Sequence, residues 1–165
     1  MQTWSYVRVT HWLVAVTLAL GLGTAAHAED KPATTTVVPG AQQWTPAGKD
    51  WPRGMRIMLI EGDPAQAGPY VVRVRVPSGY VWPPMKYPDE RTTTILKGKL
   101  WYAEGDRRNP KAMQELEAGA TFKTPAATPH YQWARTEVIL QITGTGPVGS
   151  DAIVYVNPED DPRQQ

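Results

Sequence analysis

Proline and glycine interrupt this sequence every eight to twelve residues from about residue 44 onward, and this spacing constrains the fold more than any other feature. The runs between them are short and rich in Val, Ile, Thr, Tyr and Trp, which favour strands. Evenly spaced short strands with turn signals predict an all-β sandwich or barrel. The predicted strands are 56–60, 70–76, 92–96, 100–103, 121–124, 131–134, 138–143 and 152–156.

One of these runs shows the strand period directly. Val72, Val74 and Val76 alternate with Arg73 and Arg75. Successive side chains of a strand point to opposite faces, so we expect the valines to pack inward and the arginines to lie outside or at a mouth. A helical turn is predicted only in the segment 110–117.

The amino-terminal segment differs from the rest of the chain. Arg8 precedes the apolar stretch 12–26, and residues 26–28 (Ala-His-Ala) have the small-x-small pattern of a signal-peptidase site. The most apolar part of this stretch, residues 12–22, is too short to cross a bilayer without its flanking residues. We therefore predict a signal peptide, residues 1–28, cleaved after Ala28, and a periplasmic or secreted mature protein with no membrane association.

The remaining chain divides by composition. Residues 29–43 are small, polar and Pro-containing, which predicts a flexible lead-in. The β-rich pattern predicts a single domain over 44–160, followed by a short tail, 161–165.

Charge and cysteine content exclude several classes of protein. Cleavage would remove Arg8, so the 17 basic residues of the full chain fall to 16, the number of acidic residues. A nucleic-acid-binding surface needs a surplus of Lys and Arg, which this balance lacks. Without cysteine, the fold has no disulfides, thiolate metal ligands or Cys nucleophiles.

Two blocks carry a recognisable spacing. In the first, Gly79 is followed after five residues by Met85-Lys86-Tyr87, then Pro88-Asp89-Glu90-Arg91 and finally Gly98. In the second, Gly119 is followed after five residues by Pro125-Ala126-Ala127, then two residues and His130.

These blocks resemble the two motifs of the cupin superfamily, in the order and separation found there. The second block departs from the family only at Ala127, where the motif has Gly. Flanking segments (61–64, 96–98 and 155–158) also resemble small single-domain bacterial cupins of the RmlC-like type, and the resemblance covers about residues 44–160. It implies a double-stranded β-helix, the cupin or jelly-roll barrel, and, as a modest expectation, a homodimer.

The resemblance also implies a degenerate metal site. Met85 and Tyr87 stand where metal-binding cupins have His-x-His, and Arg91 stands at the usual Glu spacing, with Glu90 one residue earlier. Only His130 matches a ligand position. A thioether binds hard ions poorly, and a phenol with a free pKa near 10 ligates only as costly phenolate. We therefore expect no resident metal cofactor, while a copper or other transition-metal site stays open.

The same alignment predicts a ligand pocket. Its candidate substrate-binding residues are Met85, Tyr87, Glu90, Arg91, His130 and Gln132. Glu90 and Arg91 cannot both face the cavity from a regular strand, because alternation has period two. An inward Arg91 favours an anionic ligand, whereas an inward Glu90 favours weak metal binding.

Three functions remain open at this stage. The first is small-molecule binding or sensing without catalysis. The second is a metal-independent isomerase or epimerase in which His130 is the general base and Tyr87 the general acid. The third is a metal-dependent cupin oxygenase or isomerase with an atypical site. The sequence does not decide among them or identify the ligand.

Overall fold

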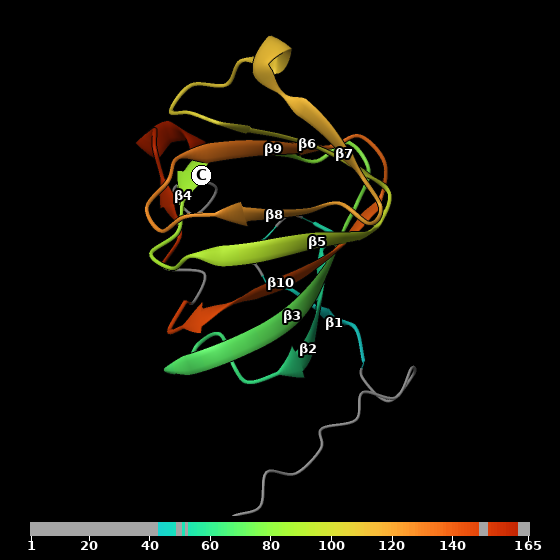
Figure 1. The fold of residues 1–165 in the computed structure, drawn as a ribbon, viewed down its shortest axis with the longest axis vertical. Coiled ribbons are helices and arrows are strands. Elements are labelled where there is room, and N and C mark those ends of the chain that lie inside the picture. Colours follow the sequence, from blue (N-terminus) through green and yellow to red (C-terminus); the bar gives the residue numbers. More distant parts are fainter. Residues whose placement is uncertain (1–42, 49–50, 52, 149–151, 162–165) are drawn as a thin grey trace, which may run out of the picture. The chain divides into compact units, whose positions relative to one another are not determined.

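The computed structural model describes residues 43–48, 51, 53–148 and 152–161, all within one compact unit of the chain. The predicted signal peptide and nearly all of the lead-in lie outside the described residues. Two antiparallel sheets face each other (Figure 1). Among the described residues, no helix is long and apolar enough to span a bilayer.

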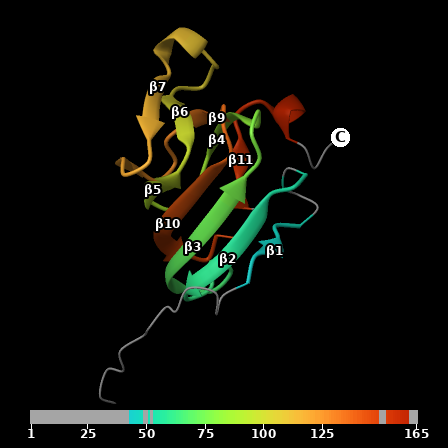
Figure 2. The same cartoon turned by 90° about the vertical axis from the view of Figure 1, so that its right-hand side faces the viewer.

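The larger sheet has six strands in the order β1-β2-β3-β10-β5-β8. Figure 2 shows β2 and β3 side by side, with β10 next to β3. The strands of this sheet are β1 (Thr45–Pro46), β2 (Arg56–Glu61), β3 (Gly68–Val76), β5 (Arg91–Lys97), β8 (Thr121–Thr124) and β10 (Val138–Gly146).

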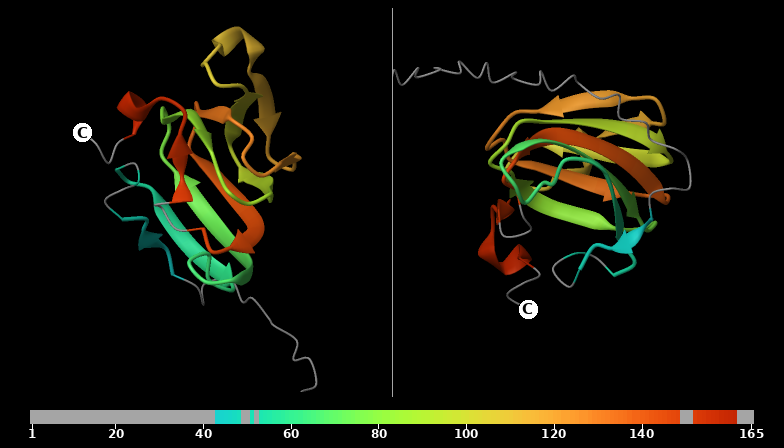
Figure 3. Two further views of the ribbon diagram at one scale, coloured as in Figure 1. Left: turned by 90° about the vertical axis from the view of Figure 1, so that its left-hand side faces the viewer. Right: turned by 90° about the horizontal axis from the view of Figure 1, so that it is seen from below.

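The second sheet has five strands in the order β11-β4-β9-β6-β7. Two further views show how the strands of both sheets run around a common interior (Figure 3). The strands of the second sheet are β4 (Val81–Lys86), β6 (Lys99–Glu104), β7 (Gln114–Glu117), β9 (His130–Ala134) and β11 (Val154–Tyr155). The all-β prediction and all eight predicted strands are confirmed, although β11 is shorter than 152–156.

The alternation in β3 is confirmed. Val72, Val74 and Val76 are buried in the core between the sheets. On the opposite face of β3, Arg73 donates to Gln141 of β10, and Arg75 donates to Glu137, the residue directly before β10. Burial of the valines contributes favourable free energy in proportion to the apolar area removed from water.

The prediction of a helical turn over 110–117 is half wrong. A single 3₁₀ turn, η1 (Pro110–Ala112), is capped by the Asn109 side chain, which accepts from the Lys111 backbone N–H. Gln114–Glu117 is instead the edge strand β7, paired with β6. Lys99 of β6 forms ion pairs with Glu115 and Glu117 of β7. Tertiary pairing has therefore overridden the local helical preference.

Strand β4 contains Pro83 and Pro84 and was not among the predicted strands. Proline cannot donate to a ladder, and it is found in sheets at edges and bulges. The register between β4 and β9 shifts between Trp82 and Met85, so the two prolines lie in an irregularity of the sheet.

The second motif keeps its turn without its glycine. Ala127 has φ 57°, in the left-handed region that favours Gly, and it is the only described non-glycine residue with a positive φ. Its backbone N–H donates to the Tyr87 carbonyl, which joins the two motif blocks.

Candidate functional site

The site is a cavity of about 90 Å³ between the two sheets. One wall is aliphatic and comes from the larger sheet: Val72, Val74, Leu140 and Ile142. The polar lining comes from both sheets: Tyr70, Tyr87, Arg91, Thr93, Thr124, His130 and Gln132. The cavity is therefore mainly apolar, with polar side chains contributed by both sheets.

His130 is the first residue of β9 and is almost completely buried. Its Nδ1 donates to the Thr128 carbonyl oxygen at 2.9 Å, because a carbonyl can only accept. Burial lowers the pKa of the imidazole below its usual value, with the nearby Arg91 charge acting in the same direction. The ring is therefore neutral near pH 7, and its Nε2 is an acceptor.

Two tyrosine rings flank this imidazole. The ring centres of Tyr87 and Tyr102 each lie 5.7 Å from that of His130, both tilted by 30°. These contacts fix the plane of the His130 ring.

Arg91 points inward from the start of β5. Its side chain is 10% exposed and lies in an ion pair with Asp89, whose side chain is 7% exposed, at 2.6 Å. The second carboxylate oxygen of Asp89 accepts from the Tyr70 hydroxyl at 2.9 Å. Burial raises the pKa of Tyr70, so this hydroxyl remains protonated and able to donate.

Glu90 does not join these groups. Its carboxylate lies on the outer surface and pairs with Lys123 of β8 at 2.9 Å. The strand period explains the difference, since neighbouring residues at the start of β5 face opposite ways. Of the two alternatives left open by the sequence, the inward one is Arg91.

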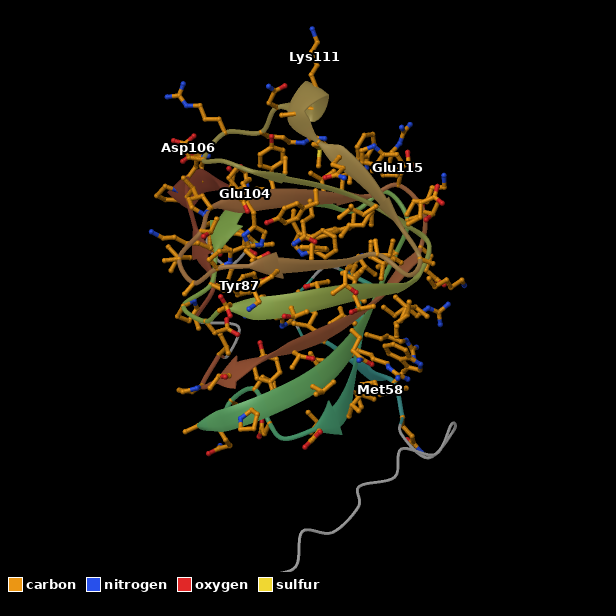
Figure 4. All side chains as sticks on the ribbon, in the orientation of Figure 1. Met58, Tyr87, Glu104, Asp106, Lys111 and Glu115 are labelled. Atoms are coloured by element: carbon orange, nitrogen blue, oxygen red, sulfur yellow. The ribbon has the colours of Figure 1, made fainter. Side chains whose placement is uncertain are left out.

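Tyr87 lies directly after β4, on the side of the barrel where β5 begins (Figure 4). The Arg91 guanidinium carbon is 3.3 Å from the centre of its ring. Burial raises the pKa of the Tyr87 phenol, and Arg91 opposes that effect. The hydroxyl faces the Met85 sulfur at 3.7 Å. Met85 is buried behind Tyr87 and does not line the cavity itself.

Gln132 lies two residues after His130 on the same face of β9 and also lines the cavity. Its Oε1 is buried and has no hydrogen-bond partner among the described residues. Buried polar groups are normally paired, and an unpaired one is costly. This amide therefore marks a position where a polar group of a ligand would be stabilised.

No protein-family model and no curated protein matches the sequence. Solved structures do share the fold. The polyketide cyclase RemF from Streptomyces resistomycificus has a TM-score of 0.59 at 14% identity, over 80% of this chain and 92% of its own. An RmlC-like cupin from Shewanella frigidimarina has a TM-score of 0.54 at 14% identity, over 68% of this chain and 91% of its own. The chain has the cupin fold.

Enzymes are among the proteins that share this fold. The DMSP lyase DddQ from Ruegeria pomeroyi has a TM-score of 0.54 at 19% identity, over 72% of this chain and 62% of its own. At such identities the likeness concerns the fold, and the chemistry depends on the residues of this chain.

The residues of this site do not fit a resident divalent metal. His130 is the only imidazole at the family's ligand positions, and the cationic Arg91 lies against the Tyr87 ring. Within the described ranges, no group of three or more His, Asp or Glu side chains stands close enough to hold a metal ion. Met85 and Tyr87 face each other, and the raised pKa of the phenol disfavours the phenolate that a metal needs.

Several members of the site were missing from the predicted set, among them Thr93 and Thr124 of the polar lining and the two residues that position Arg91. Asp89 and Tyr70 hold Arg91 in place, yet neither was predicted to line the pocket. Asp89 lies two residues before Arg91, and this spacing was the only available signal. Tyr70 is 19 residues from Asp89 in the chain and gave no signal.

Proposed function

We propose that this protein is exported and that it binds or senses a small molecule in the cavity between its sheets. The composition of the cavity wall supports this proposal: aliphatic side chains of β3 and β10 line it together with the polar side chains of Arg91, His130 and Gln132. A mainly apolar cavity with a few convergent polar groups is typical of small-molecule sites. The volume of about 90 Å³ favours a ligand of few non-hydrogen atoms.

Filling the cavity tests the binding function. Val74 lines the cavity, whereas Val71 lies on the other face of the same strand. We expect a hit from a thermal-shift screen of small metabolites to stabilise the wild type and Val71→Phe, but not Val74→Phe. Equal stabilisation of all three proteins, or a screen without any hit, would contradict the proposal.

A second candidate is a metal-independent isomerase or epimerase. The state of His130 favours it, because a neutral imidazole with Nδ1 held by a carbonyl keeps Nε2 as a proton acceptor. Tyr87, with its proton retained, would be the acid. However, no carboxylate of the described residues orients the imidazole, whose Nδ1 bonds a backbone carbonyl instead. Turnover that is lost in His130→Asn and Tyr87→Phe, with ligand affinity retained, would support catalysis. Binding without turnover in the wild type would support the binding protein.

The metal content of the protein distinguishes these two candidates from a third, the metal-dependent oxygenase or isomerase. Elemental analysis of the purified protein is expected to give far less than one metal ion per chain. A near-stoichiometric content would restore the metal-dependent oxygenase or isomerase with an atypical site.

Export has its own test. Expressed with its complete amino-terminal segment in a bacterium, the protein is expected in the periplasm or the medium. Its mass should correspond to a chain that begins at Glu29. Retention of the full-length chain in the cytoplasm would contradict this part of the proposal.

A further inference from the structure

Two polar groups of the cavity face lie on one strand. His130 Nε2 and the Gln132 amide belong to residues i and i+2 of β9, and both side chains line the cavity. Among the described residues, neither has a hydrogen-bond partner there: the imidazole bonds only through Nδ1, and Gln132 Oε1 is buried unpaired. A hydroxyl suits both when the Gln132 amide is turned to present its NH2 group, because the single hydroxyl proton can then be donated to Nε2 while the hydroxyl oxygen accepts from the amide.

The charge of Arg91 is already compensated. Asp89 accepts from Arg91 Nε at 3.2 Å and from Nη2 at 2.6 Å, so the buried pair is neutral as a whole. Arg91 also lines the cavity and has N–H groups beyond those two, since a guanidinium carries five. A ligand carboxylate would add a buried net charge, whereas a neutral carbonyl would accept from Arg91 without that cost.

The distance between these groups limits the ligand. Arg91 Cζ is 3.3 Å from the Tyr87 ring centre, which is 5.7 Å from the His130 ring centre. Arg91 Cζ and the His130 ring centre are therefore no more than about 9 Å apart. A ligand whose two oxygens are on adjacent carbons can span up to that distance with two hydrogen bonds of about 2.9 Å.

We infer that the ligand is a small neutral α-hydroxycarbonyl compound. Its hydroxyl lies between His130 and Gln132, its carbonyl accepts from Arg91, and its apolar remainder contacts the valines of β3 and the aliphatic side chains of β10. This inference rests on the proposed binding function and refines the sequence-based expectation: an inward Arg91 alone favours an anion, but its pairing with Asp89 favours a neutral ligand.

Three small probes of one chemical series test the inference by NMR titration at neutral pH. Lactamide has both the hydroxyl and a neutral carbonyl, propionamide lacks the hydroxyl, and lactate carries a negative charge. We expect lactamide to bind about tenfold more tightly than propionamide, because propionamide leaves buried polar groups unpaired. We expect lactate to bind more weakly than lactamide by a similar factor.

Two glutamine variants provide the comparison. Gln132→Met should reduce the preference for lactamide over propionamide severalfold, because the hydroxyl of lactamide then loses its partner at this position. Gln114→Met, on the exposed strand β7, should alter neither affinity.

The outcomes separate the inference from the function on which it rests. Absence of binding by every probe, up to its solubility limit, would contradict ligand binding in this cavity. Probes that bind in the cavity with no advantage for lactamide over propionamide would overturn the inference alone. Tighter binding of lactate than of lactamide would also overturn the inference of a neutral ligand.

Discussion

Glu90 and Arg91 are neighbours in the chain, but their ion pairs lie in opposite environments. On the outer surface, Glu90 and Lys123 are 2.9 Å apart, with side chains 55% and 60% exposed. Inside, Arg91 and Asp89 are 2.6 Å apart, with side chains 10% and 7% exposed. Similar distances therefore have different consequences, because water screens the outer charges while the inner pair depends on its own partners.

The largest effect is expected from Asp89→Asn. It leaves the Arg91 guanidinium buried without a counter-charge, and the free energy of unfolding should fall by about 3–5 kcal/mol. Denaturant titration measures the loss. Asp106→Asn, at an exposed loop position, is the control and should have little effect. A loss no larger than that of the control would remove the distinction between the two ion pairs.

The double variant Asp89→Asn/Arg91→Gln sharpens this result. Replacing both charges should recover much of the stability lost in Asp89→Asn, because no unpaired charge then remains. A double variant as unstable as the sum of the two single variants would show that the charges do not act as a pair.

Gly144→Ala tests how tightly the inner pair is packed. A Cβ at Gly144 would overlap the Asp89 carboxylate and the Tyr70 hydroxyl. The free energy of unfolding should fall by about 1–3 kcal/mol through overpacking. Adding Tyr70→Phe removes one of the overlapping atoms, so the double variant should be more stable than additivity predicts. Strict additivity would argue against this contact.

The pH dependence of stability tests the inner environment through His130. Because its folded-state pKa is lowered, the unfolded chain binds the proton more strongly. Stability should therefore be complete above the unfolded pKa, near 6.5, and decline as pH falls below it. His130→Gln should flatten this decline in denaturant titrations across that range. An unchanged profile in the variant would assign the decline to other groups.

The smallest effect is expected from Glu90→Gln. The exposed pair should contribute no more than about 0.5 kcal/mol, and added salt should reduce that contribution further. Thermal unfolding at low and at high ionic strength measures the contribution of the ion pair and its dependence on salt. A loss that approaches that of Asp89→Asn would show that exposure does not distinguish the two pairs.

The sequence by itself determined eight of the described strands and the spacing of the turns. Alternation is a local property, so the inward valines of β3 could be identified without knowledge of the other strands. The motif spacing also identified His130 and the turn at Ala127, which keeps the left-handed conformation of the missing glycine. Alternation further showed that only one of Glu90 and Arg91 can face inward.

Only the tertiary structure decided that Arg91, and not Glu90, faces inward, and which groups surround it. The Tyr70–Asp89–Arg91 group joins β3 to the segment before β5, and the unpaired amide of Gln132 is defined by the lack of partners across the cavity. The edge strand β7 likewise depends on pairing with β6. Pairing and burial arise between residues far apart in the chain, and local periodicity carries no information about them.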